Sequence, residues 1–275
     1  MKKTPVSADT SVDSDLIKQA RIKSKSMLGV GKNNRPFLDY VLYNATQAGY
    51  KDIILVVGEN DTSIKSYYGT KPKNNIFPEI HISYALQTIP RGRAKPLGTA
   101  DALLQALTLR TCWKGKKFTV CNSDNLYSIR AFRLLKDDPH PNAFIDYNQA
   151  ALKYKKKRIQ KFAVTKKDTR GFLQQIIEKP TKEDIERVKD SYGNIGVSMN
   201  IFRFSYDMIL PFLEKVPINP ERQEKELPEA VVMMIEEHPQ SCYAIFLDEH
   251  VPDLTSCNDI ENVRKYLTAD FNNVV

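Results

Sequence analysis

Apolar residues along the chain alternate between two spacings, which predicts helices and strands in turn. The first helix carries its apolar residues on one face: Phe37, Leu38, Val41, Leu42 and Ala45. Gly49 ends this helix, and residues 52–57 form an apolar, β-branched run typical of a strand. The same order continues along the chain, with helices expected at 62–68 and 99–107 and strands at 81–86 and 117–121.

This alternation favours an α/β fold with a mostly parallel, doubly wound sheet flanked by helices. Strands of such a sheet are covered on both faces, which suits the apolar run 52–57. In open sheets of this kind ligands bind beyond the carboxyl ends of the strands. Polar residues that directly follow a strand are therefore the first candidates for chemistry.

The pattern changes beyond residue 142. Short strand candidates linked by charged turns lie at 143–148, 162–165 and 172–179, which favours a small antiparallel extension. Further elements are a strand at 195–204, helices at 181–190, 205–215 and 224–237, a strand at 243–247 and a final helix at 258–267. One side of the 224–237 helix is apolar, and we interpret it as a core face rather than as an oligomer contact.

Composition excludes several classes of protein. No apolar run approaches the about 20 residues that a membrane-spanning helix needs. Residues 1–15 have no apolar core of a secretory signal, so we expect a cytoplasmic protein. The four cysteines and four histidines lack the spacings of a zinc site, so any metal should be bound by oxygen atoms.

The formal net charge of +8 is compatible with a nucleic-acid surface or with a pocket for a polyanion such as a nucleoside triphosphate. The densest basic cluster is 153–161, which we interpret as a solvated hairpin or loop, with polyanion contact as the alternative. No aromatic and glycine pattern of an RNA-binding sheet accompanies it. We therefore expect no nucleic-acid partner and no membrane partner.

Two aspartates follow predicted strands and could share one edge of the sheet. Asp124 lies just past the strand at 117–121, and Asp253 follows the strand at 243–247 after a short polar connection. Two carboxylates at one edge could hold Mg²⁺, although aspartates after strands are also common turn residues. Gly98-Thr-Ala-Asp101 could likewise cradle a ligand or simply begin a helix, and Glu178-Lys179-Pro180 could simply end a strand.

Taken together, these segments match a family in order and spacing. The matching pieces are Lys25-Ser-Met27, Phe37-Leu-Asp-Tyr-Val41, Lys51-Asp-Ile-Ile-Leu-Val-Val-Gly58, Tyr84-Ala-Leu-Gln87, Leu97-Gly-Thr-Ala-Asp-Ala102, Asn122-Ser-Asp124, Ile177-Glu-Lys-Pro180, Asn194-Ile-Gly196 and Val251-Pro-Asp253. In these segments the chain resembles the sugar-1-phosphate nucleotidyltransferases, the group that includes glucose-1-phosphate uridylyl- and thymidylyltransferases. The resemblance implies a reaction in which a nucleoside triphosphate, UTP or dTTP, and a sugar 1-phosphate give a nucleotide sugar and pyrophosphate.

The resemblance also implies roles for particular residues. Gln87 and the backbone of Gly98, with Thr99, would bind the nucleotide and read its base, and Lys25 would contact its phosphates. Asp124 and Asp253 would hold the catalytic Mg²⁺. Lys179 would neutralise the sugar phosphate, and Glu178, Asn194 and the backbone of Gly196 would bind the sugar side. Lys25, Asp124 and Lys179 are the implied catalytic residues.

One domain is expected at 23–267, with a nucleotide half at about 23–141 and a sugar-phosphate half at about 142–267. Residues 1–22 have the polar composition of a disordered segment, and 268–275 would form a tail. A homo-oligomer is compatible with the sequence.

The sequence departs from the family pattern at its start. Members begin with a central strand and a glycine-rich loop ending in arginine, and neither precedes Lys25 here. A start assigned too far downstream, a shortened form and a true loop-less paralogue are the three explanations. Rival functions are a nucleotide or sugar-phosphate sensor and a cytidylyltransferase that uses phosphocholine.

Overall fold

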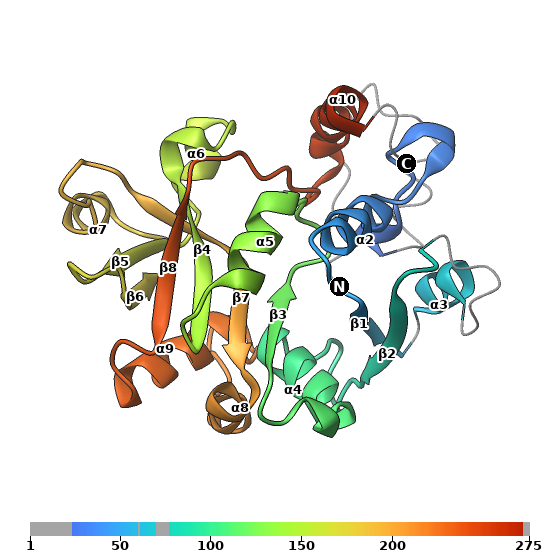
Figure 1. Cartoon of the computed structure of the whole chain (residues 1–275), viewed down its shortest axis with the longest axis horizontal. Helices are drawn as coiled ribbons and strands as arrows, with labels where there is room; N and C mark the ends of the chain where they lie inside the picture. Colours follow the sequence, from blue (N-terminus) through green and yellow to red (C-terminus); the bar gives the residue numbers. More distant parts are fainter. Residues whose placement is uncertain (1–23, 60, 70–76, 272–275) are drawn as a thin grey trace. The chain divides into compact units, whose positions relative to one another are not determined.

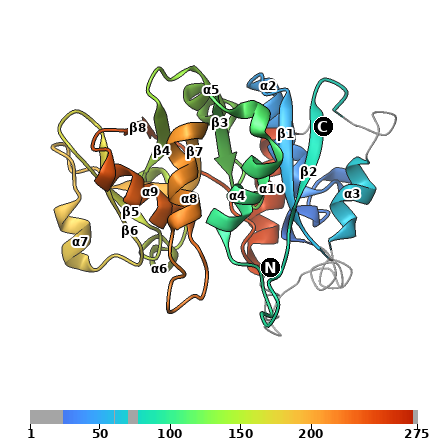
Figure 2. The same ribbon diagram turned by 90° about the horizontal axis from the view of Figure 1, so that it is seen from below.

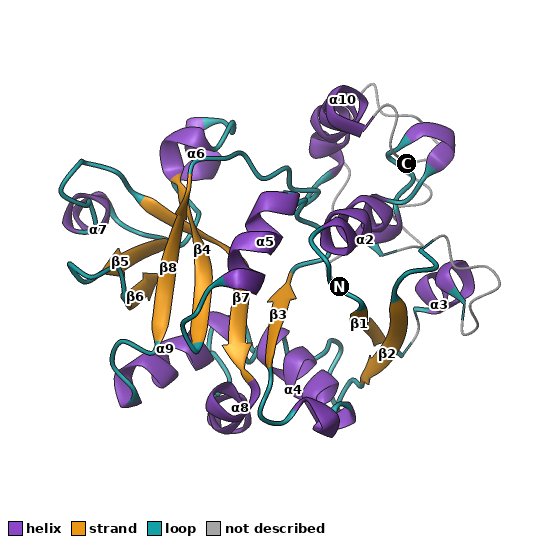
Figure 3. Cartoon of the chain, in the orientation of Figure 1, coloured by secondary structure: helices purple, strands orange, loops and turns teal. Residues whose placement is uncertain are grey.

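The computed structural model describes residues 24–59, 61–69 and 77–271 (Figure 1). The expected polar segment 1–22 lies outside the described residues, as do the last residues of the expected tail. Helices and strands alternate along the described chain, and the predicted α/β class is confirmed (Figure 3).

The described residues divide into two compact units. The first contains the described residues up to 96, together with 123–129 and 252–271, and the second contains 97–122 and 130–251. The chain thus passes from one unit to the other several times. The predicted division near residue 141 separates a nucleotide half from a sugar-phosphate half, and it remains a prediction.

The first unit is built around two parallel strands, β1 (Asp52–Gly58) and β2 (His81–Gln87). Its helices are α2 (Phe37–Gln47), α3 (Thr62–Tyr68) and α10 (Ile260–Phe271). Asp39 of α2 is fully buried and accepts hydrogen bonds from Tyr68 Oη at 2.6 Å and Tyr67 Oη at 3.0 Å. These bonds tie α3 to α2.

β1 and β2 are less covered than the sequence predicts. Val56 is 37% exposed and Leu86 45%, although both lie in apolar strand runs. Within the described residues β1 pairs with β2 only, so its apolar side chains lack the close packing of a wide sheet. The two strands of the first unit are therefore only partly covered.

The second unit contains a six-stranded sheet in the order β6-β5-β7-β4-β8, with β3 paired to β7. The strands are β3 (Lys117–Cys121), β4 (Asn142–Asn148), β5 (Val164–Lys167), β6 (Leu173–Ile177), β7 (Gly196–Ser205) and β8 (Cys242–Leu247). β3, β4, β5 and β8 run in one direction, while β6 and β7 run the other way. Four of these strands thus share one direction, but in the described part of this sheet only the pair β4 and β8 is parallel, because β7 runs antiparallel to β3, β4 and β5.

A large apolar core joins one face of this sheet to three helices. The helices are α4 (Thr99–Leu109), α8 (Tyr206–Lys215) and α9 (Leu227–Glu237). Phe144 of β4 and Phe202 and Phe204 of β7 are fully buried against them. The apolar side of α9 belongs to this core, which confirms the interpretation of that face.

Sequence reasoning missed two helices and misjudged the length of others. It missed α5 (Ile129–Asp137), which lies on the side of β7 away from α8 (Figure 2), and α6 (Lys156–Ile159). The basic run 153–161 is thus not a hairpin but a turn followed by the short helix α6. α7 (Lys182–Arg187) begins at a capping box of Thr181 and Asp184 but is shorter than predicted, whereas α10 extends to Phe271 into the expected tail. None of the helices in the described parts of the chain has the length and apolar character required to span a bilayer.

His250 gives the second unit a pH dependence. Burial, aided by the charges of Lys153 and Arg158, lowers the pKa of His250 to about 4. In an unfolded chain this pKa is about 6.5, so between these values the unfolded state binds more protons and stability falls as pH falls. We expect the free energy of unfolding, measured with urea, to fall from pH 7 to pH 4. It should fall less in His250→Asn.

Asparagine suits this test because it keeps an acceptor for the backbone N–H of Lys153, which donates to His250 Nδ1 at 3.2 Å. His81→Asn, at an imidazole that is 67% exposed, is the control for the same substitution outside this buried site. If the free energy of unfolding changes with pH equally in His250→Asn and in wild type, His250 is not the source of this pH dependence.

Candidate functional site

Asp124 and Asp253 are brought together by pairing of two backbone segments in the first unit. Asn125 and Asp253 form an isolated antiparallel bridge. The backbone N–H of Leu254 donates to the carbonyl of Asp124 at 2.8 Å, and that of Leu126 donates to the carbonyl of Pro252 at 2.8 Å. Residues more than a hundred positions apart thereby place their carboxylates in one cluster.

The two carboxylates repel one another in a poorly solvated place. Burial, and next the charge of Asp253, raise the pKa of Asp124. The ammonium group of Lys25 opposes this rise. Asp253 is only 8% exposed and accepts a hydrogen bond from Thr255 Oγ1 at 2.6 Å, while Lys25 Nζ donates to the carbonyl of Thr255 at 2.5 Å.

This cluster fits a hard divalent cation. Two adjacent carboxylates lose their mutual repulsion when a cation binds between them. No group of three or more acidic, histidine or cysteine side chains placed to hold a metal occurs within 24–59, 61–69 and 77–271. Mg²⁺ usually takes one or two carboxylates and leaves its other positions to water and phosphate oxygens, so Asp124 and Asp253 could hold it, and the metal remains a prediction.

Gln87 is the last residue of β2 and lies opposite Gly58 in the parallel register. Both residues stand at the carboxyl ends of their strands, where open α/β sheets bind ligands. Tyr84 of the same strand donates from its hydroxyl to the carbonyl of Gly69 at 2.8 Å, which fixes β2 to the end of α3. The base-reading role of Gln87 remains a prediction.

Gly98 and Thr99 begin α4 and are tied to the segment that begins α9. Gly98 has a φ of 113°, and a Cβ atom there would lie 2.6 Å from the carbonyl oxygen of Lys225. Ala100 donates its N–H to that same oxygen at 3.0 Å, and Leu227 donates to Thr99 Oγ1 at 2.9 Å. Only glycine fits position 98, because it allows both this φ and this close approach.

Glu178 and Lys179 are also held by the segment before α9. Glu178 pairs with Arg222 at 3.5 Å, and Lys179 pairs with Glu221 at 3.6 Å. Arg222 forms a second ion pair with Glu226. Burial raises the pKa of Glu178, and the Arg222 charge opposes that rise.

Arg222 escaped sequence reasoning because it lies in a charged segment without a motif. Asn219 accepts the backbone N–H groups of Glu221 and Arg222, both at 3.0 Å, and so fixes the turn that aims Arg222. An asparagine three residues before the arginine was the available signal. Arg222 belongs with the candidate site because it contacts Glu178 directly.

Asn194 and Gly196 make contacts within the second unit that serve its structure. Asn194 donates from its backbone N–H and from Nδ2 to the carboxylate of Asp190, at 2.8 and 3.1 Å, closing a turn. Gly196 lies against the buried carboxylate of Asp146, which accepts from Thr165 Oγ1 at 2.5 Å.

Lys167 forms an ion pair with the other oxygen of Asp146, whose side chain is fully buried. This buried network was not predicted, although an aspartate inside the apolar strand 142–148 is an available signal for one.

The predicted residues thus fall into two groups. Lys25, Gln87, Asp124 and Asp253 lie in the first unit, while Gly98, Thr99, Glu178, Lys179, Asn194 and Gly196 lie in the second. Within the first unit Lys25 and the two aspartates form one cluster. Within the second, the segment from Asn219 to Leu227 contacts both Gly98-Thr99 and Glu178-Lys179.

Comparison with known proteins identifies the family of this chain. The model of the nucleotidyl transferase family matches residues 20–270. A bifunctional protein GlmU from Staphylococcus epidermidis is 22% identical over 247 residues, which are 88% of this chain and 48% of that protein. The chain spans about half the length of the curated relatives it matches.

Solved structures show the same fold. A UDP-glucose pyrophosphorylase complexed with UDP-glucose is 17% identical, with a TM-score of 0.67 over 93% of this chain and 94% of that one. A UTP-bound UGPase from Acinetobacter baumannii is 17% identical, with a TM-score of 0.68 over 92% and 89%. The family model spans nearly all the described residues, and the chain therefore belongs to the nucleotidyl transferase family.

Proposed function

We propose that this protein is a Mg²⁺-dependent enzyme that joins UTP or dTTP to a sugar 1-phosphate and releases pyrophosphate. The observation that carries the proposal is the cluster of Asp124, Asp253 and Lys25. Two carboxylates beside one lysine suit a reaction in which a metal ion and an ammonium group must hold phosphate oxygens. The solved structures similar to this chain include one with UDP-glucose and one with UTP, which supports a uridine nucleotide as the first choice.

The chemistry needs positive charge and alignment rather than a general base. A phosphate oxygen of the sugar phosphate, already ionised, attacks the α-phosphorus of the triphosphate while pyrophosphate leaves on the opposite side. Both reactants are anions, so their repulsion is the main obstacle. Mg²⁺ bound by Asp124 and Asp253 would supply charge that neutralises phosphate oxygens.

The protein's own residues divide the remaining tasks. Lys25, close to Asp124, holds a nucleotide phosphate oxygen in place. Lys179 exchanges its exposed ion pair with Glu221 for the phosphate of the sugar substrate, at little cost because such pairs are weak. Burial raises the pKa of Glu178, and the charge of Arg222 opposes that rise, which favours the ionised carboxylate that would accept hydrogen bonds from sugar hydroxyls.

The direct test is to incubate the protein with Mg²⁺, UTP and glucose 1-phosphate and to measure pyrophosphate. Release that requires both substrates is the expected result. dTTP and other sugar 1-phosphates follow as the next pairs. If no pair releases pyrophosphate, the proposal is wrong.

Lys179→Ala should affect the sugar substrate alone. Because one cation is removed from the sugar phosphate, we expect kcat/KM for the sugar 1-phosphate to fall at least about tenfold. The KM for the triphosphate should stay near its wild-type value. Steady-state kinetics with each substrate varied in turn measures both, with Lys215→Ala as the control for loss of one positive charge. An equal rise in both KM values would contradict the assignment.

A further inference from the structure

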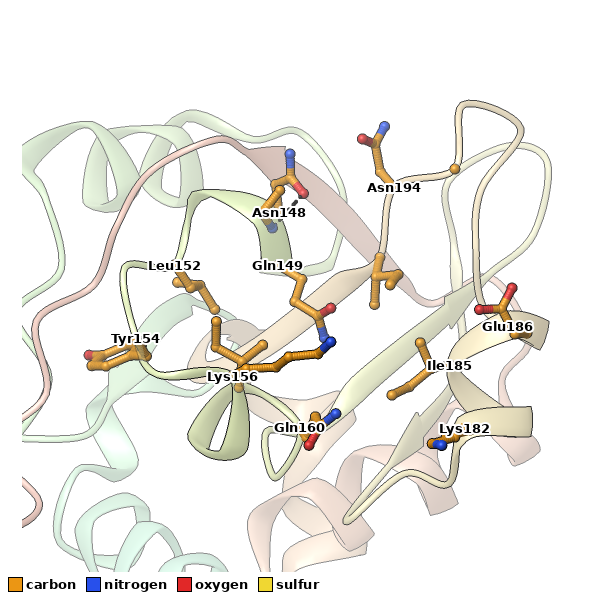
Figure 4. A pocket seen from close by; sticks show the side chains of 14 residues that line it. Asn148, Gln149, Leu152, Tyr154, Lys156, Gln160, Lys182, Ile185, Glu186 and Asn194 are labelled. Carbon is orange, nitrogen blue, oxygen red and sulfur yellow. Dashed lines mark hydrogen bonds between the residues drawn. The ribbon is translucent and has the colours of Figure 1, made fainter.

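A second candidate site lies in a pocket of the second unit (Figure 4). It encloses about 530 Å³ between η5 (Gln149–Ala151), α6, α7 and the connection that leads into β7. This volume falls within the range of small-molecule sites, about 300–1,000 Å³. Neither Glu178 nor Lys179 lines it, whereas Asn194 does.

The pocket carries positive charge without matching negative charge. Lys156 and Lys182 line it, and neither has an ion pair or a side-chain hydrogen bond with any residue that the structure describes. Glu186 is the acidic residue in the lining, and its carboxylate is already paired with Lys189 at 2.5 Å. The pocket therefore attracts an anion.

Gln149 adds a hydrogen-bond donor that has no acceptor. Its Nε2 atom is buried and makes no hydrogen bond in the described structure. Figure 4 shows the side chains of Gln149 and Lys156 pointing toward each other. An unpaired buried N–H group is costly, and an anionic oxygen between the amide and the ammonium group would satisfy both.

The surroundings strengthen the positive field. The basic run 153–161 contributes Lys156 to the pocket, and its other lysines form no ion pair within the described residues. Arg158 lies over the ring of Tyr154, 4.5 Å from its centroid. Burial is the main cause of the lowered pKa of His250, and the charges of Lys153 and Arg158 in this run lower it further.

The rest of the lining suits a body with hydroxyl groups. Leu152, Ile185 and Ile195 give apolar contact, while Gln160 provides a second amide beside that of Gln149. A free phosphate ion would fill only a small part of the volume. A phosphate monoester on a small polyhydroxyl body would use the lysines, the amides and the apolar wall together.

We propose that this pocket binds a small phosphate monoester at a site separate from Glu178 and Lys179. The inference does not rest on the proposed function, because binding requires no nucleotide and no turnover. It assigns Asn194 to this second site rather than to the sugar-phosphate site.

Titration calorimetry with glucose 6-phosphate, and with inorganic phosphate as the smaller probe, tests the proposal. We expect glucose 6-phosphate to bind the wild-type protein more tightly than phosphate. In Lys156→Met with Lys182→Met the binding constant should fall at least tenfold, since two charge-assisted contacts are lost. Methionine keeps much of the side-chain length, so the shape of the pocket is retained.

A matched variant shows whether binding depends on the lysines of the pocket or only on the positive charge of the basic run. Lys155→Met with Lys157→Met removes the same charge from the same basic run but from side chains that do not line the pocket, and it should bind within about twofold of wild type. Equal weakening in both double variants would overturn the proposal, as would failure of the wild-type protein to bind. Loss of binding in Lys179→Ala would place the probe at the other site and would overturn it too.

Discussion

Asp253→Asn should reduce turnover at least about a hundredfold while the protein stays folded. The change removes one of two anionic oxygen ligands from the site proposed for Mg²⁺. Asparagine keeps the size of the side chain and an oxygen that can accept the hydrogen bond from Thr255 Oγ1. The backbone bridge between Asn125 and position 253 does not depend on the carboxylate, so the local structure should persist.

Asp124→Asn should have an effect of similar size, because the two carboxylates act on the same ion. Pyrophosphate release at saturating substrates gives the turnover, and circular dichroism with thermal melting checks the fold. Asp52→Asn, at an exposed carboxylate paired with His81, is the matched control and should keep full activity. A folded Asp253→Asn enzyme with near-normal turnover would remove Asp253 from the metal site.

Raising the Mg²⁺ concentration gives a further check on this assignment. If Asp253 acts as a ligand, the variant should need more Mg²⁺ to reach half of its own maximal rate. A loss of turnover with an unchanged Mg²⁺ requirement would point to a different role for the carboxylate. The two outcomes separate metal binding from a purely local effect on structure.

The sequence predicts much of the fold because apolar spacing is a local property. β1, β3 and α4 are read directly from runs and periods of apolar residues. α5 was missed although its signal is equally local: Ala131, Phe132 and Leu135 are buried at helical spacing, and charged residues occupy the opposite face. The position of β7 shows the limit of this approach, since nothing in an apolar run tells which strands it will pair with.

The candidate site is less predictable because its contacts join distant segments. Asp124 and Asp253 could be proposed from their places after strands, but the bridge that brings them together depends on tertiary structure. Arg222 is a clearer case, because only the folded turn from Asn219 to Glu226 aims it at Glu178. The buried Asp146 with Lys167 similarly depends on the pairing of strands.

Gly196 is where the sequence and the structure suggest different reasons for one residue. Resemblance to the family implies that its backbone orients sugar hydroxyls, whereas the structure shows it packed against the carboxylate of Asp146. A Cβ atom at this position would overlap both carboxylate oxygens of Asp146 and would lie 2.5 Å from Thr165 Oγ1. The carboxylate of Asp146 is paired with Lys167 and accepts a hydrogen bond from Thr165 Oγ1, so a shift that makes room for a Cβ atom would disturb both contacts.

Gly196→Ala should therefore lower the free energy of unfolding by about 3 kcal/mol or more, through overpacking and loss of the buried ion pair. At about 2–4 °C per kcal/mol for large domains, the melting temperature should fall by about 6 °C or more. Gly58→Ala is the matched control, because a Cβ atom at Gly58 meets nothing within 4 Å, and it should melt near wild type. Since alanine keeps the backbone N–H, a Gly196→Ala protein with wild-type stability and a raised KM for the sugar 1-phosphate would refute the packing role and favour direct contact with the substrate.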